Sequence, residues 1–277
     1  MTNFLLWNTN KKAPDEIIVQ LVKEHDVDVL LLIERNHPAA SLLSELNSVA
    51  PFQVVASHER FHLLTRFNSA LVNRLKPVVE DDRSDYWHLK LPAQADILLV
   101  GVHGYDIQNY EPDEREMLLT RISENIRFLE GNTTKHKRTV VFGDFNANPF
   151  DSVVGSLRGL HAIQLPSVSG KHSRPYQKQQ HEFFYNPMWT RFGSGGKPLA
   201  THYYYKYKPH ELFWHMLDQV VLRPAALPLF PEAELKIISE VGGSSLLRKN
   251  GTPDPKLGSD HLPLFFRLDL AKVGTNG

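Results

Sequence analysis

The hydrophobic positions of the chain follow two patterns: short apolar runs that end at polar residues, and longer stretches in which apolar residues recur every three to four positions. Short runs of this kind indicate the strands of a buried sheet. They occur at residues 4–7, 27–33, 96–102, 139–142, 219–222 and, with alternating apolar residues, 262–268. Helices are predicted after Pro14 and Pro112, because two acidic residues and an amphipathic stripe follow each proline. Together these elements predict an α/β layered fold.

Polar residues that can take part in chemistry stand at the ends of these predicted strands. A rigid sheet can bring strand ends from distant parts of the chain together. The residues concerned are Asn8, Glu34, His103, Asp144, Asn146, Asp218, Asp260 and His261. Their distance in the sequence argues against local turn chemistry as the common explanation, although Asp144 with Asn146 also fits an Asx-turn.

This set contains carboxylates, amides and two histidines, and the chain has no cysteine. Hard oxygen ligands suit Mg²⁺ or Mn²⁺, and the absence of thiolates argues against structural zinc. A histidine on either side of a phosphorus atom can act as base and acid. The residues therefore predict metal-assisted hydrolysis of a phosphoester.

Several of these residues lie in motifs that resemble the endonuclease/exonuclease/phosphatase (DNase I-like) superfamily. The two most specific are Gly143-Asp144-Phe145-Asn146 and Ser259-Asp260-His261. The others, in the order that the family shows, are Trp7-Asn8, Leu31-Leu32-Ile33-Glu34, Val102-His103 and Leu217-Asp218-Gln219-Val220-Val221. The resemblance implies a four-layer α/β sandwich in which two helix-flanked sheets pack face to face. We expect one domain, residues 1–277, with long polar surface loops near 166–200.

The resemblance also implies a role for each residue. Glu34 would bind the metal ion, helped by Asn8 or Asn10 and by Asp260. Asp144 would position or deprotonate the attacking water, and Asn146 would donate a hydrogen bond to the phosphate. His261, oriented by Asp218, would be the general base or would stabilise the transition state. His103 would protonate the leaving oxygen or hold a non-bridging one, with Glu59 as its acidic partner.

Departures from the family's patterns narrow the expected function. Abasic-site endonucleases usually have Thr-Lys after the metal-binding glutamate and tyrosine in the place of His103, whereas Arg35-Asn36 follows Glu34 here. Secreted DNases have a structural disulfide and a signal peptide, and this sequence shows neither. A dedicated abasic-site repair enzyme and a secreted DNase are therefore both disfavoured.

Charge is balanced in total but not along the chain. The sequence has 31 Lys and Arg against 31 Asp and Glu, yet residues 1–165 have 17 basic against 22 acidic side chains. Residues 171–208 combine seven basic side chains and ten aromatic ones with the single acid Glu182. Aromatic rings interleaved with cations can stack on bases and contact phosphates, so Arg191, Lys206 and Lys208 are predicted to bind substrate. The competing interpretation is that the tyrosines of 203–207 form a half-buried sheet surface.

Several protein classes are disfavoured by composition. Without cysteine a disulfide scaffold is excluded, and no apolar run approaches the about 20 residues of a membrane span. The first residues have no secretory signal pattern, so a cytoplasmic location is expected. The sequence favours a Mg²⁺- or Mn²⁺-dependent nuclease, most plausibly a DNA endonuclease without a membrane partner. The alternatives are a phosphatase or phosphodiesterase for a small-molecule or phospholipid phosphoester, and a binding module on a degenerate nuclease fold.

Overall fold

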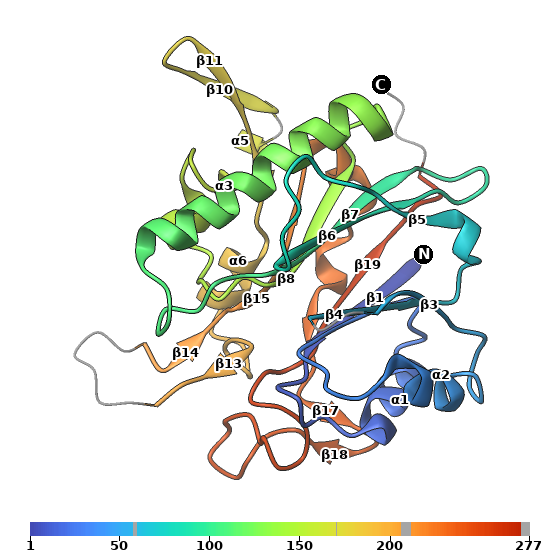
Figure 1. Ribbon diagram of the computed structural model, residues 1–277. Helices are drawn as coiled ribbons and strands as arrows, with labels where there is room; N and C mark the ends of the chain where they lie inside the picture. Colours follow the sequence, from blue (N-terminus) through green and yellow to red (C-terminus); the bar gives the residue numbers. More distant parts are fainter. Residues whose placement is uncertain (58–59, 170, 206–211, 273–277) are drawn as a thin grey trace.

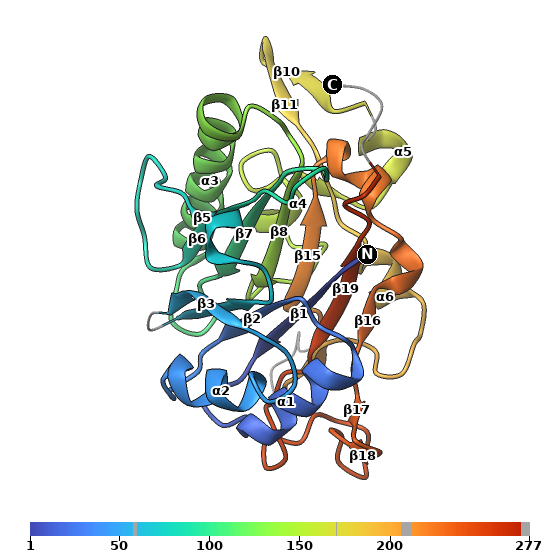
Figure 2. The same cartoon turned by 90° about the vertical axis from the view of Figure 1, so that its right-hand side faces the viewer.

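Two β-sheets pack face to face in the computed structural model, which describes residues 1–57, 60–169, 171–205 and 212–272 (Figures 1 and 2). One sheet has six strands, in the spatial order β16 (Lys236–Ile237), β19 (Leu264–Leu268), β1 (Thr2–Asn8), β2 (Val29–Ile33), β4 (Phe61–Thr65) and β3 (Gln53–Ser57). The other has seven, in the order β5 (Val72–Arg74), β6 (Ser84–Leu89), β7 (Ile97–His103), β8 (Thr139–Asp144), β15 (Asp218–Leu222), β12 (Phe184–Tyr185) and β9 (Ala162–Ile163).

Helices cover the two outer faces. In Figure 1, α3 (Pro112–Leu129) lies across the outer face of the seven-stranded sheet, and α1 (Asp15–Glu24) and α2 (Ala39–Leu46) lie beyond the six-stranded sheet on the other side. The order of layers is therefore helix, sheet, sheet, helix. The predicted four-layer α/β sandwich is confirmed.

Side chains of β1 show why the strands read as continuous apolar runs. Successive side chains of a strand point to opposite faces. Phe4 and Leu6 belong to the core between the two sheets, whereas Leu5 and Trp7 pack with the residues of α1 and α2. Because both faces are covered, every position from Phe4 to Trp7 is apolar, and at about 25 cal/mol per Å² of buried apolar surface this burial is the main stabilising contribution.

Residues 166–200 differ from the prediction of long surface loops. This segment contains α5 (Pro166–Ser169), the hairpin of β10 (Ser173–Tyr176) and β11 (Gln179–Glu182), strand β12 and α6 (Met188–Gly193). The prediction was wrong because β10 and β11 are largely exposed and lack an apolar face, and β12 is too short to show a period. Figure 1 shows the β10–β11 hairpin projecting from the body of the molecule.

The remaining elements are short and connect the layers. They are the 3₁₀ turn η1 (Ser69–Leu71), the π-helical turn η2 (Glu130–Thr134), α4 (Ser152–Gly155), β13 (His202–Tyr203), β14 (Trp214–His215), the 3₁₀ turns η3 (Pro224–Leu229) and η4 (Glu232–Glu234), β17 (Glu240–Val241) and β18 (Ser244–Ser245). Within the described ranges, no helix has the length and apolar character needed to cross a membrane.

Candidate active site

The predicted site residues meet at one end of both sheets. Strands β1 and β2 are parallel, as are β7 and β8, so the carboxyl ends of each pair lie together. Strand β15 runs antiparallel to β8 and begins at the same end, where Asp218 is paired with Asp144. Strand β19 runs antiparallel to β1, which places His261, just before β19, at this end as well. Strand direction alone therefore gathers residues from six separate segments.

Three side-chain contacts join the ends of the two sheets. Asn8 donates from Nδ2 to Oδ2 of Asp144 over 2.8 Å. Nε2 of His103 lies 3.1 Å from Oε1 of Glu34. Nδ1 of His261 lies 2.8 Å from Oδ2 of Asp218. In each pair one residue belongs to the six-stranded sheet or its adjoining loop and the other to the seven-stranded sheet, so the site spans the boundary between them.

His261 is held from several sides. Trp7 donates from its indole nitrogen to the main-chain oxygen of His261, and the main-chain nitrogen of His261 donates to Oγ of Ser259. With Nδ1 engaged by Asp218, Nε2 faces Asp144, whose Oδ2 is 4.0 Å away. Burial disfavours the charged ring, but the neighbouring carboxylates outweigh burial and raise the pKa of His261. The ring is therefore oriented and electrostatically favoured as a proton donor.

A second set of contacts holds the oxygen donors of the site. Asn10 donates from Nδ2 to Oδ1 of Asp260 over 2.7 Å, and its main-chain nitrogen donates to Oδ1 of Asn8. The hydrogen bond from His103 outweighs burial and lowers the pKa of Glu34. Burial opposes ionisation of Asp260, but the neighbouring histidines prevail and hold its pKa below the usual range.

Three of the site residues adopt left-handed backbone conformations that residues other than glycine rarely adopt. Asn10 has φ of 41°, Glu34 has φ of 53° and Asn146 has φ of 49°. The main-chain oxygen of Glu34 is fixed by hydrogen bonds from Oγ1 of Thr9 and the nitrogen of Lys11. Strained backbone of this kind persists where surrounding contacts over-determine it, and it is concentrated at functional sites.

The donor set fits a hard divalent cation. Carboxylate and amide oxygens of Glu34, Asp144, Asp260, Asn8 and Asn10 line or adjoin a polar cavity of about 340 Å³. One donor atom each from Asp144, Asp218 and His261 lies within 4.8 Å of the others. Mg²⁺ and Mn²⁺ prefer oxygen ligands and use few carboxylates, as this set provides.

Asp144 and Asn146 form the Asx-turn that their spacing allowed, and they also lie in the site. Oδ1 of Asp144 accepts from the main-chain nitrogen of Asn146 over 2.8 Å. Nδ2 of Asn146 donates to the main-chain oxygen of Gly104 over 3.0 Å. The Asx-turn and the role in the site are therefore compatible, because the turn directs both side chains into the cavity.

Gly104 is required by the close approach of two loops at the site. A Cβ atom there would lie 2.1 Å from the main-chain oxygen of Phe145. We expect Gly104→Ala to lower the free energy of unfolding by about 1–3 kcal/mol, because the loop that contains Asn146 must move. Thermal denaturation measures this effect. Gly131→Ala is the control, since no atom lies within 4 Å of its Cβ position, and equal melting temperatures for the two variants would contradict the prediction.

Some residues of the site had not been found from the sequence. The ring of His202 lies 4.6 Å from that of His261, and its Nε2 is 3.8 Å from Oδ2 of Asp260. Arg83 lines the polar cavity, and Arg115 lines a second cavity and donates to the main-chain oxygen of Asn146. Of these residues, only His202 could have been suspected from the sequence, because it belongs to the aromatic segment. Its neighbour Thr201 contacts the site, since Oγ1 of Thr201 accepts from the main-chain nitrogen of Asp218.

The predicted substrate-binding residues have mixed outcomes. Glu59, Lys206 and Lys208 lie outside the described residues, so their roles stay predictions. Arg191 lies on α6 and is not among the residues that line the two cavities.

The basic hairpin β10–β11 lies away from the site. Glu182 at its end pairs with Lys137, which precedes β8, whereas Asp144 ends that strand. Tyr204, from the aromatic run, does line the second cavity, and its hydroxyl accepts from Nε2 of Gln108. Tyr204 and His202, and not the described lysines and arginines of residues 171–205, are therefore the part of this segment that reaches the site.

Two helix-flanked sheets with carboxylates, amides and paired histidines at their shared end define a phosphoester hydrolase of the DNase I-like fold. The chain belongs to the endonuclease/exonuclease/phosphatase family, whose model matches residues 5–261. No curated protein sequence is significantly similar to it.

Solved structures share the fold at low sequence identity. They include an AP endonuclease from Archaeoglobus fulgidus, with a TM-score of 0.56, 13% identity and coverage of 97% of this chain and 100% of that one. A family member from Leptotrichia buccalis has a TM-score of 0.58, 13% identity and coverage of 97% and 99%. A 3′ phosphatase from Neisseria, bound to a product DNA hairpin, has a TM-score of 0.56, 14% identity and coverage of 97% and 100%. At this identity the likeness shows the fold alone.

Proposed function

We propose that the protein is a nuclease that hydrolyses phosphodiester bonds with the help of Mg²⁺ or Mn²⁺, with DNA as its substrate and endonucleolytic cleavage as its mode. One observation supports this most strongly. The pairs Asn8–Asp144 and Glu34–His103 line one polar cavity together with His261, whose ring Asp218 holds from outside the cavity, so a single phosphate can be reached from both sheets.

In this proposal Glu34, with Asn8, Asn10 and Asp260, would hold the cation. When bound, the cation supplies Lewis-acid polarisation of the phosphoryl group and neutralises developing charge. Each of the other residues acts through its own atoms. The carboxylate of Asp144 orients the attacking water and accepts its proton. Nε2 of His261, with its ring fixed by Asp218, donates a hydrogen bond to a non-bridging oxygen.

On the opposite side of the cavity His103 protonates the leaving oxygen. Its Nε2 lies 3.1 Å from Oε1 of Glu34, and this contact orients the ring. In the proposed step the leaving oxygen of the substrate replaces Oε1 as the acceptor of the Nε2 proton. Asn146 donates one amide hydrogen to the main-chain oxygen of Gly104, and its second amide hydrogen can be donated to the phosphate. The division of roles requires no residue beyond those at the sheet ends.

A polynucleotide substrate is supported by the surroundings of the cavity. Arg60 and Arg83 line the polar cavity, and Arg115 and Tyr204 line the cavity beside it. Both cavities include Asn146, Asp260 and His261, so a strand can continue from one into the other. Arginine contacts phosphate and tyrosine stacks on bases, each independently of sequence. The abasic-site endonuclease and the DNA-bound 3′ phosphatase of similar fold agree with this substrate class.

A second candidate, hydrolysis of a small phosphoester, is favoured by the neighbouring cavity. It has a volume of about 590 Å³ and includes the apolar residues Ile107, Leu212 and Leu217. This volume is within the range of pockets for small ligands, about 300–1,000 Å³. A phosphoester with an apolar leaving group would place its phosphate at His261 and its organic part in this cavity.

A substrate panel distinguishes these candidates. We expect purified protein to nick supercoiled plasmid in Mg²⁺ or Mn²⁺ and to lose this activity in EDTA, with single-stranded DNA, RNA and small phosphomonoesters and phosphodiesters as the other substrates. The variant His261→Gln, prepared in parallel, controls for a contaminating nuclease. Turnover of the small phosphoesters alone would replace the nuclease by the second candidate, and no turnover of any substrate would contradict both.

A further inference from the structure

A second group of metal-ligating side chains lies at the end of the seven-stranded sheet that is opposite the active site. His88 lies near the end of β6, Asp96 directly precedes β7, and His136 lies three residues before β8. His103 and Asp144 end β7 and β8, and a strand rises about 3.3 Å per residue. The two groups are therefore about 20 Å apart, and neither shares a residue with the other.

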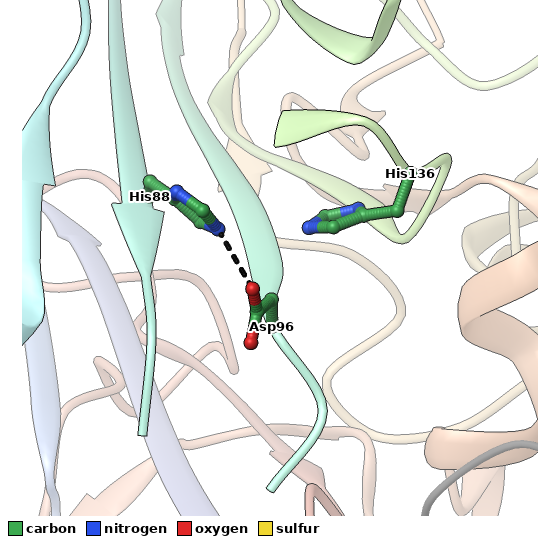
Figure 3. Close-up of side chains that lie close together, drawn as sticks. All are labelled: His88, Asp96 and His136. Carbon is green, nitrogen blue, oxygen red and sulfur yellow. Dashed lines mark ion pairs between the residues drawn. The ribbon is translucent and has the colours of Figure 1, made fainter. Parts of the chain in front are cut away.

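The three side chains converge (Figure 3). Nε2 of His88 lies 3.3 Å from Oδ2 of Asp96, and the two histidine rings are 5.6 Å apart between centroids. One donor atom from each of the three residues lies within 4.8 Å of the other two. Nε2 of His136 is buried and has no hydrogen-bond partner among the described residues. The group thus contains a buried nitrogen whose bonding capacity the protein itself does not use.

We propose that His88, Asp96 and His136 bind a borderline divalent transition-metal ion, and that the ion is Zn²⁺. Two imidazole nitrogens with one carboxylate oxygen are a common protein donor set for Zn²⁺, with water as the fourth ligand. The hard ion Mg²⁺ prefers oxygen ligands and disfavours this set. The site does not rest on the function proposed for the active site.

The geometry is close to that of a bound zinc ion. Zinc–ligand bonds of about 2.0–2.2 Å at tetrahedral angles separate neighbouring ligand atoms by about 3.3–3.5 Å. His88 and Asp96 already have this separation, with their nitrogen and oxygen 3.3 Å apart. The donor atom of His136 lies within 4.8 Å of the other two, so it has at most about 1.5 Å to approach. Binding through Nε2 requires the ring proton on Nδ1, so Nδ1 must release the hydrogen bond that it accepts from the main-chain nitrogen of Arg138, which at 3.2 Å is at the long end of the range.

The surroundings leave the three ligands available. Arg138 donates from Nε to the main-chain oxygen of Asp96, which fixes this residue without occupying its carboxylate. Burial is the main cause that lowers the pKa of both histidines, helped by Lys90 and Arg138 at His88 and by Arg138 at His136, and the lowered pKa favours the neutral rings. Metal binding requires neutral imidazole. The side chain of Asp96 is 26% exposed, so an ion can reach the group from solvent.

A bound ion would join the hairpin between β6 and β7 to the segment that precedes β8. Such a link stabilises the folded state by RT ln(1 + c/Kd), where c is the free Zn²⁺ concentration, so the stabilisation grows with the logarithm of c above the Kd. The expected consequence is structural: a higher melting temperature, with no direct part in phosphoester hydrolysis.

The test measures Zn²⁺ binding to EDTA-treated and dialysed full-length protein by equilibrium dialysis with metal analysis. Because the active site can also hold Zn²⁺, the informative quantity is the difference between variants. His136→Ala is expected to bind one equivalent fewer than the wild type, or to bind that equivalent more than about tenfold more weakly. Glu34→Gln is expected to retain it, and His172→Ala, which removes an exposed histidine, is the matched control.

Thermal denaturation gives a second readout. Zn²⁺ at about a hundred times its Kd is expected to raise the melting temperature of the wild type by about 5 °C more than that of His136→Ala. Far-UV circular dichroism and a cooperative thermal transition without Zn²⁺ verify that the variant is folded. If His136→Ala does not fold, the isosteric Asp96→Asn takes its place. Equal stoichiometry and equal thermal shifts in the wild type and the ligand variants would overturn the proposal.

Discussion

Replacing His261 by glutamine is expected to lower the rate of metal-dependent phosphoester cleavage by about a thousandfold while leaving the protein folded. A positioned histidine that handles a proton or stabilises developing charge typically contributes about 10²–10⁴-fold. His261 is oriented by a 2.8 Å contact between its Nδ1 and Asp218, and its Nε2 faces Asp144. Initial rates on the substrate identified by the panel, at saturating Mg²⁺, measure the effect.

A double variant tests whether His261 and Asp218 act as a unit. If Asp218 acts only by orienting the ring, Asp218→Asn should be impaired on its own but should add little to His261→Gln. His172→Gln, an exposed histidine far from the sheet ends in sequence, should retain the wild-type rate. If His261→Gln keeps more than a tenth of the wild-type rate, the role assigned to this histidine is wrong.

Replacing Arg223 by methionine is expected to lower the free energy of unfolding by about 3–5 kcal/mol, the largest effect on stability that we predict. Arg223 is 2% exposed and makes two hydrogen bonds to the carboxylate of Glu130, itself 3% exposed. Removing one partner of a buried ion pair leaves the other charge without compensation. The melting temperature should fall by about 10 °C.

Two comparisons show whether the uncompensated charge is the cause. Arg223→Met combined with Glu130→Gln removes both charges and should recover part of the loss. Lys76→Ala breaks a fully exposed pair with Glu80 and should change stability by less than about 1 kcal/mol. Asp218 begins β15, and Arg223 follows the opposite end of this strand. The single variant should therefore still cleave substrate at temperatures where it is folded. A melting temperature equal to that of Lys76→Ala would contradict the assignment.

The strands predicted from the sequence are those that are buried on both faces. For β1, β2, β7 and β8, each apolar residue packs either between the sheets or under a helix, and the apolar run shows this directly. Strand β6 escaped prediction because Ser84 and Asp85 interrupt its pattern. Both are buried, and their partners Asp81 and Arg74 satisfy them, which a pattern of hydrophobicity cannot show. The group of His88, Asp96 and His136 was missed as well, because a pattern of hydrophobicity does not show which polar side chains lie close together.

The site was predictable as a list of residues but not as a set of pairs. Strand-end positions and motif order identified Glu34, His103, Asp218 and His261. The contact between Nε2 of His103 and Glu34 was not predicted. The predicted partner of His103, Glu59, lies outside the described residues and stays a prediction. The sequence also led to the cations of residues 171–208, while the described arginines of the cavities come from other segments, among them Arg83 and Arg115.

By itself the sequence determined which residues form the buried strands, at which end of each strand the polar side chains stand, and the kind of cation their oxygen atoms suit. These properties follow from local patterns, because the order of apolar and polar residues within one segment indicates that the strand is buried and at which residue it ends. Only the tertiary structure decided that Asn8, Glu34 and His261 each meet a partner from the other sheet. That choice depends on how the two sheets pack, and the packing is fixed by many small contacts in the shared core that no short segment contains.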